Sequence, residues 1–169
     1  MLLVDTGRLD EARRVARDLV RAYETVVARP DTDAVTLDGY AVFLLEVEPP
    51  DVRDPARALP IATRAVAASG RKHYLRLKTL AQAHAALGQP QQAIAIAREA
   101  LALPGAIQSW TAEALLVDLL QKHGTPAEVE AFLLQRLDQY PRLGRAHENF
   151  VAKTMRHLAH FYARQGRTQ

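Results

Sequence analysis

Residues 77–100 of the chain read LKTLAQAHAALGQPQQAIAIAREA, and their residue pattern is the clearest indication of the fold. Small and apolar residues recur in it at intervals of three and four, on both sides of a turn at Gly88: Leu77, Leu80, Ala81, then Ala93, Ala97, Ala100. Residues at this spacing share one face of an α-helix. Alanine lets two helix backbones approach closely, because a larger side chain there would overpack. The stretch therefore predicts two helices joined by a turn and packed face to face.

The same pattern occurs elsewhere in the chain. It appears upstream at Leu37, Tyr40, Ala41, Leu44, then Ala58, Ala62, Ala65. It appears downstream, with an acid and a base as departures, at Glu113, Leu116, Val117, Leu120, Val129, Leu133, Arg136. The beginning of the chain keeps mostly a second helix, with Ala12, Ala16, Leu19, and the end only a first helix, with Met155, Leu158, Ala159, Tyr162. Strand-type alternation is nearly absent, so the chain is predicted to be all-α with about nine helices.

Glycine and proline divide the helices from one another. We expect Gly7, Gly88, Gly124 and Gly166 to end helices in the left-handed conformation. Pro55, Pro90 and Pro126 mark the helix starts that follow, because a first-turn proline loses no hydrogen bond. Thr125 and Glu128 have the spacing of a capping box. An insertion at residues 48–53 is expected to project as a surface loop.

These residues resemble the tetratricopeptide repeat, a pair of antiparallel helices of about 34 residues. The resemblance implies one domain over residues 1–169, an α-solenoid of stacked helix pairs. Its approximate repeats are 1–31 (partial), 32–70, 71–104, 105–141 and 142–169 (partial). The function implied is a protein–protein interaction scaffold that binds a peptide or a helix of a partner in a concave groove.

A narrower likeness concerns the run PDVRDPARA at residues 50–58, followed by Ala62 and Ala65-Val66. It is similar to repeats appended to bacterial eukaryotic-type serine/threonine kinases, although no kinase motif is present. This likeness implies the alternative that the chain is the accessory repeat region of a larger bacterial signalling protein.

Composition narrows the classes of function. The 169 residues carry a net charge of +3, and 49% of them are hydrophobic. So small a charge, without a basic stripe, does not favour nucleic acid as a partner. No apolar run approaches the ~20 residues of a membrane span. The chain has no cysteine, which excludes disulfides and cysteine-ligated zinc. We expect a cytoplasmic protein that needs no cofactor.

In the resembled family, first helices line the groove. Counted from the repeat pattern, the groove-facing candidates are Lys78, Gln82, Asp118, Gln121, Lys122, Lys153, Arg156, His157, His160 and Arg164. The family's carboxylate clamp is matched at Lys78 and Lys153, but Gln82, Leu115 and His157 depart from it. The basic cluster on the last helix could attract an acidic peptide, since arginine pairs well with carboxylates and phosphates. The alternative is that these residues form a solvated face.

The sequence gives little indication of a metal site or a catalytic site. His157 and His160 could share a helix face, but no further metal ligands are evident, so we predict no metal site. His84 lies in a packing position and is interpreted as a half-buried histidine, and Trp110 as a packing anchor. Neither serine, Ser69 nor Ser109, lies in a nucleophile elbow. The chain is therefore predicted not to be an enzyme.

The last helix carries more apolar residues than one face needs, namely Phe150, Val151, Met155, Leu158, Ala159, Phe161 and Tyr162. Either the chain continues a longer array, or this surface packs on another copy and makes a homo-oligomer. A wide stripe buried within the chain is the third interpretation.

Overall fold

A computed structural model of the chain describes residues 6–106, 109–140 and 148–166. Within these ranges the chain forms eight α-helices, one short 3₁₀ helix and no strand. The all-α prediction is confirmed, and the predicted helix number of about nine is one too high. The elements are α1 (Thr6–Val27), α2 (Ala34–Glu46), η1 (Pro50–Val52), α3 (Pro55–Ala68), α4 (Tyr74–Ala86), α5 (Pro90–Ala102), α6 (Trp110–His123), α7 (Pro126–Gln139) and α8 (Glu148–Arg164).

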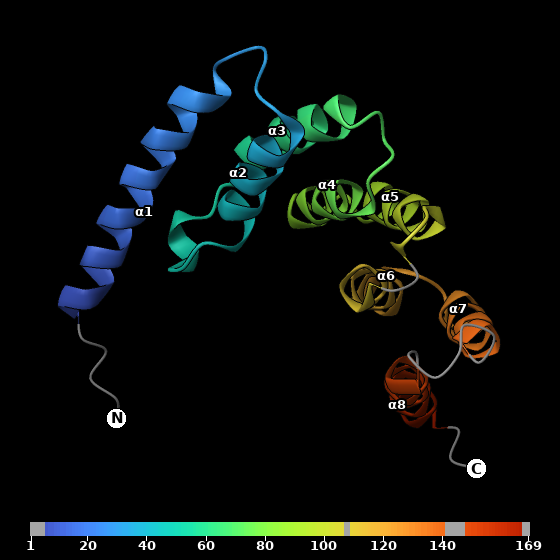
Figure 1. Cartoon of the computed structure of the whole chain (residues 1–169). Coiled ribbons are helices and arrows are strands. Elements are labelled where there is room, and N and C mark those ends of the chain that lie inside the picture. Colours follow the sequence, from blue (N-terminus) through green and yellow to red (C-terminus); the bar gives the residue numbers. More distant parts are fainter. Residues whose placement is uncertain (1–5, 107–108, 141–147, 167–169) are drawn as a thin grey trace.

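Helices that follow one another in the sequence also pack against one another. From α2 to α8 each helix contacts the next, and α4 in addition contacts both α2 and α6. Figure 1 shows the result as a curved row, with α4, α6 and α8 along one side and α5 and α7 along the other. We call the side formed by α2, α4, α6 and α8 the inner face.

Alanines lie where the helices come closest. Ala41, Ala58, Ala81 and Ala93 are all 0% exposed, as the spacing predicts. The leucines of the same pattern are buried with them; Leu77, for instance, packs in a cluster with Ala62 of α3 and Ala100 of α5. Close packing of small side chains therefore carries the contacts between successive helices.

Two of the four glycines that were predicted to be left-handed have that conformation. Gly88 and Gly166 have φ values of +70° and +67°, so both adopt the left-handed conformation. The prediction is wrong for Gly124, which caps α6 with φ −90° and ψ 177°. A Cβ there would lie 2.8 Å from the carbonyl oxygen of Leu120, so close approach explains the glycine. Gly7 was also wrongly predicted, because it lies within α1.

The predicted helix starts are confirmed. Pro55, Pro90 and Pro126 each occupy the first turn of a helix. At α7 the hydroxyl of Thr125 accepts a hydrogen bond from the backbone N–H of Glu128 at 3.2 Å. The Glu128 carboxylate in turn accepts one from the backbone N–H of Thr125 at 2.9 Å. This reciprocal pair is the predicted capping box.

The insertion at residues 48–53 lies at the surface but does not project freely. Its η1 turn presents Asp51, whose carboxylate accepts a hydrogen bond from Arg13 of α1 at 2.9 Å. Arg53 folds back and donates to the carbonyl oxygen of Val47 at 2.9 Å. The segment therefore ties α1 to the rest of the chain.

The two end helices carry exposed apolar residues. In α1, Ala16 is buried, but Leu19 is 41% exposed. In α8, Met155 is 57% exposed, and the buried side chains are Thr154 and Phe161. The apolar residues of α8 are therefore not all buried within the described part of the chain.

Candidate functional site

The ten predicted site residues come from three helices of the inner face. Lys78, Gln82, Gln121, Lys153 and His157 are half-buried. The exposed members are Asp118, Lys122, Arg156, His160 and Arg164. Of these ten residues the structure brings Gln121 and Arg164 to one cavity, and Gln82, Lys122 and Lys153 contact neighbouring side chains.

A polar contact joins the inner sides of α2 and α4. The side-chain amide of Gln82 donates a hydrogen bond to the Glu46 carboxylate at 3.2 Å. The oxygen of the same amide, Oε1 of Gln82, is buried and finds no donor among the described residues, and the same holds for Oδ1 of Asp38 on α2. Unpaired buried acceptors are uncommon in folded proteins, so this part of the inner face has unused hydrogen-bonding capacity.

Charges on α6 are paired within the helix. Lys122 donates a hydrogen bond to the Asp118 carboxylate at 2.8 Å, one turn earlier. Both side chains are more than half exposed, so the pair contributes little to stability. It does cancel the local charge at the middle of the inner face.

Aromatic side chains join α6 to α8. The ammonium of Lys153 lies 4.8 Å from the centre of the Trp110 ring, within the range of a cation–π contact. The ring of His157 lies 5.5 Å from the same indole. Trp110 is therefore a packing anchor, as predicted. His157 faces it and lies against α6.

The protonation of His157 follows from this position. Burial lowers the pKa of His157 below its ordinary value of 6.5, and the nearby His160 and Arg156 lower it further. Both causes disfavour the charged imidazolium. His157 is therefore mainly a neutral packing residue at pH 7, and the positive charge of α8 comes from its other basic residues.

Gln121 and Arg164 meet at a small cavity. This space of about 230 Å³ lies between the end of α6, the start of α7 and the last turns of α8. Gln121 and Arg164 line it together with the buried ring of Phe161. The structure thus brings two predicted residues together at one end of the inner face.

A buried ionic network was not predicted. The pattern took Glu113 and Arg136 as departures, yet they are only 1% and 5% exposed. The Glu113 carboxylate accepts a hydrogen bond from Nε of Arg136 at 2.8 Å and another from the hydroxyl of Tyr140. Thr154 of α8 donates a third, at 3.3 Å. The signal in the sequence is that an acid and a base occupy packing positions of the same helix pair.

Burial raises the pKa of Glu113 above its usual value, and the Arg136 guanidinium and the Thr154 hydroxyl oppose that rise. A carboxylate with three donors is the arrangement that allows an ionised group to be buried. Because those donors come from α7, from Tyr140 just after it and from α8, Glu113 connects three consecutive elements.

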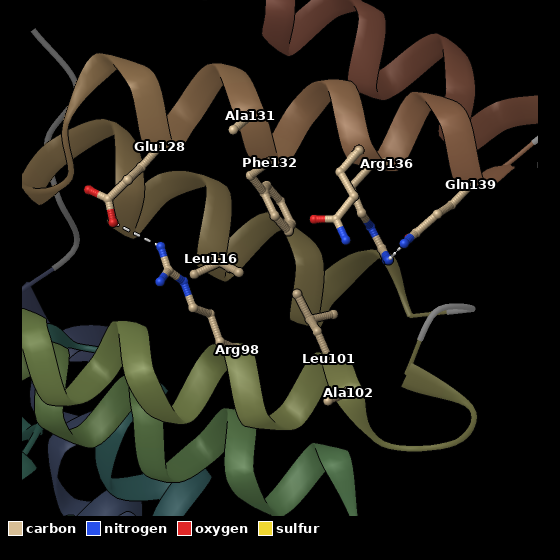
Figure 2. Close-up of a pocket in the computed structure, with 10 residues that line it drawn as sticks. Arg98, Leu101, Ala102, Leu116, Glu128, Ala131, Phe132, Arg136 and Gln139 are labelled. Atoms are coloured by element: carbon tan, nitrogen blue, oxygen red, sulfur yellow. Dashed lines mark hydrogen bonds and ion pairs between the residues drawn. The ribbon is translucent and has the colours of Figure 1, made fainter.

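The same arginine lines a cavity on the other side of the row. Figure 2 shows this space of about 580 Å³ between α5 and α7, with Leu116 of α6 at its floor. Arg98 and Glu128 pair across one end of it at 2.9 Å. At the other end Arg136 donates to Gln139 at 3.0 Å, and Phe132 lies between the two ends.

The pattern placed His84 in a packing position, and the structure finds it half-buried. Its Nδ1 lies 2.6 Å from the side-chain oxygen of Gln89. It is thus the half-buried histidine that was predicted.

Across the described ranges there is no group of three or more His, Asp or Glu that could hold a metal ion. None of the helices described is both long and apolar enough to cross a membrane.

Comparison of the chain with protein-family models, with curated protein sequences and with solved structures finds no match.

Proposed function

We propose that the chain is an interaction scaffold, a solenoid of tetratricopeptide-like helix pairs that binds an extended peptide or a helix of a partner protein along its inner face. The observation that carries the proposal is that α4 contacts both α2 and α6. The sides of α2, α4 and α6 that form the inner face are therefore parts of one continuous surface. Binding needs no chemical step, because shape and fixed polar anchors recognise the partner.

Contacts between neighbouring helices support this proposal, because they hold the anchors in place before a partner arrives. Gln82 is oriented by Glu46, and Lys153 is oriented by Trp110. A side chain that is already ordered loses less conformational entropy when it binds. The acceptor oxygens of Gln82 and Asp38 that lack donors offer hydrogen bonds that a peptide backbone could satisfy after a small side-chain adjustment.

The two ends of the inner face differ in the sign of their charge. Asp38 and Glu46 lie at the α2 end, whereas the exposed Arg156, His160 and Arg164 lie at the α8 end. None of these three basic side chains forms an ion pair within the described residues. An acidic stretch of a peptide is therefore expected to lie along α8, since arginine pairs bidentately with carboxylates.

The experiment is selection of peptides from a random-peptide display library with the immobilised chain. The affinity of the best peptide is then measured for variants. We expect the double variant Arg156→Glu/Arg164→Glu to weaken binding by about tenfold or more, because it reverses charge at the inner face. The matched control is Arg17→Glu, an exposed arginine on α1, which should leave the affinity unchanged.

Binding of an acidic peptide should also weaken as salt rises, because the charges involved are exposed. Selection of no peptide, or of peptides that bind all inner-face variants as well as the wild type, would refute the proposal.

The absence of cysteine fits a reducing, cytoplasmic setting. The likeness of residues 50–58 to kinase-associated repeats supports a place in a bacterial signalling protein.

A further inference from the structure

The first observation is an uncovered face on α8. In α2, α4 and α6, two positions of the repeat pattern are buried under the helix that follows. These positions are at most 2% exposed at Leu37 and Ala41, at Leu77 and Ala81, and at Glu113 and Val117. The matching residues of α8 are Met155, which is 57% exposed, and Ala159, which is also exposed. Met155 and Ala159 are residues of the kind that pack between helices, but no helix of the described residues packs on them.

The opposite side of α8 packs as an inner helix should. Phe161 is 6% exposed and occupies the position of Ala83 in α4 and Leu119 in α6, which are 0% and 3% exposed. These residues face the preceding helix pair. α8 is therefore half of a pair: it is seated on α6 and α7, and its second face is open.

The second observation lies at the other end of the row. An apolar stripe runs along α1 at intervals of three and four, through Ala12, Val15, Leu19, Ala22 and Val26. Val15 and Leu19 are 57% and 41% exposed. In the repeat pattern Leu19 corresponds to Ala65 of α3 and Ala100 of α5, which are 0% and 1% exposed. α1 thus resembles a second helix that has no first helix packed on it among the described residues.

The stripe borders a cleft. A space of about 460 Å³ separates the N-terminal half of α1 from α2, and Phe43 of α2 and Val47, which follows α2, complete its apolar lining. Phe43 occupies the position that in α4, α6 and α8 faces the preceding helix pair. The cleft is therefore where an inner helix that precedes α1 would lie, in contact with α1 and α2 together, as α4 contacts α5 and α6.

We propose that α8 of one copy docks in the cleft between α1 and α2 of a second copy, so that α8 and α1 form a helix pair across two chains. The two open faces are complementary, because among the described residues no second helix packs on α8 and no first helix packs on α1. A contiguous exposed apolar surface marks a site of protein–protein interaction. The interface is head-to-tail, so each joined copy still offers one open face of each kind.

This association uses the ends of the row and is independent of peptide binding on the inner face. Sedimentation velocity of the 169-residue chain over a range of concentrations tests it. We expect the wild type to form species that grow with concentration. Leu19→Arg blocks the cleft and Ala159→Arg blocks α8, so each variant alone should be monomeric. Because both residues are exposed, both variants should keep the circular dichroism spectrum of the wild type.

The decisive measurement is an equimolar mixture of the two variants. Ala159→Arg keeps an intact cleft and Leu19→Arg keeps an intact α8, so the mixture should form a 1:1 dimer that grows no further. The matched control is Leu134→Arg, at a leucine of α7 that is 47% exposed, and it should associate like the wild type. A wild type that stays monomeric at about 1 mM, beyond the range of most specific contacts, overturns the proposal. So does a mixture that remains monomeric, or a single variant that still dimerises.

Discussion

Four alanines set how closely the helices approach. Ala41, Ala58, Ala81 and Ala93 have no exposed surface, and each belongs to a core cluster formed by several helices. A small side chain at such a position leaves room for the neighbouring helix. The spacing in the sequence was sufficient to identify them, because residues three and four apart share one helix face.

Replacement of Ala81 by arginine tests this reading at a single residue. We expect Ala81→Arg to lower the free energy of unfolding by at least about 3 kcal/mol, since overpacking alone costs about 1–3 kcal/mol and the buried charge adds to it. Thermal unfolding followed by circular dichroism measures the effect. Ala86→Arg, at an exposed position of the same helix, is the control. A Tm equal to that of the wild type would show that the packing register is misassigned.

Glu113 and Arg136 place a larger, ionic contact where other pairs have small residues. We expect Arg136→Met to reduce the free energy of unfolding by about 3 kcal/mol, because it leaves a buried carboxylate without its counter-ion. The double variant Glu113→Leu/Arg136→Met should be more stable than the sum of the single changes predicts, because it leaves neither charge unpaired. Urea unfolding of the four proteins gives the coupling. Strictly additive effects would mean that the two side chains do not interact energetically.

At the scale of one helix, capping decides where α7 begins. The hydroxyl of Thr125 accepts a hydrogen bond from the backbone N–H of Glu128, so Thr125→Ala should cost about 1 kcal/mol of stability. Ser109 precedes α6 in the same position but makes no such bond. Ser109→Ala is therefore a matched control, and denaturant unfolding of both variants measures the difference. Equal losses from the two substitutions would contradict the role assigned to the capping box.

Helices α2 to α7 could be predicted from the sequence because local signals and packing signals agree there. Proline, glycine and the alanine spacing all indicate the same boundaries, as at Gly88 and Pro90. At Gly124 the residue was identified correctly but its conformation was not, because the reason for glycine is contact with Leu120 of the same helix. Such a close approach leaves no mark in a single sequence.

The candidate site was predictable only in part. The repeat spacing placed Lys78, Gln82 and Lys153 on one side of their helices, and this placement stays a prediction; the structure adds the contacts of Gln82 with Glu46 and of Lys153 with Trp110. The spacing could not show that His157 lies against Trp110, because that contact depends on how α8 is rotated. The buried network of Glu113 was missed because the pattern judges each position alone, whereas an acid is acceptable in a core only when its partners are present.

At the scale of the whole molecule, stability should differ along the row. α1 is held mainly through its C-terminal half, where Tyr23 stacks on Tyr40 with ring centres 4.7 Å apart and Arg64 donates to the carbonyl oxygen of Val27 at 2.8 Å. α4 and α5, in contrast, are covered on both sides. Hydrogen exchange followed by mass spectrometry should therefore find the first half of α1 exchanging much faster than α4 and α5. Uniform protection along all the helices would contradict this gradient.

The order of contacts along the row has a consequence for how the chain reaches its fold. Every substantial contact joins elements that are neighbours or next neighbours in the sequence. Chain segments therefore need not search for distant partners, and closing the short intervening loops costs little entropy. Folding should accordingly be rapid for a protein of this length. The pair α4–α5, which lies between α3 and α6 and contacts both, is where we expect the first stable structure to appear, with the remaining helices adding outward from it in both directions.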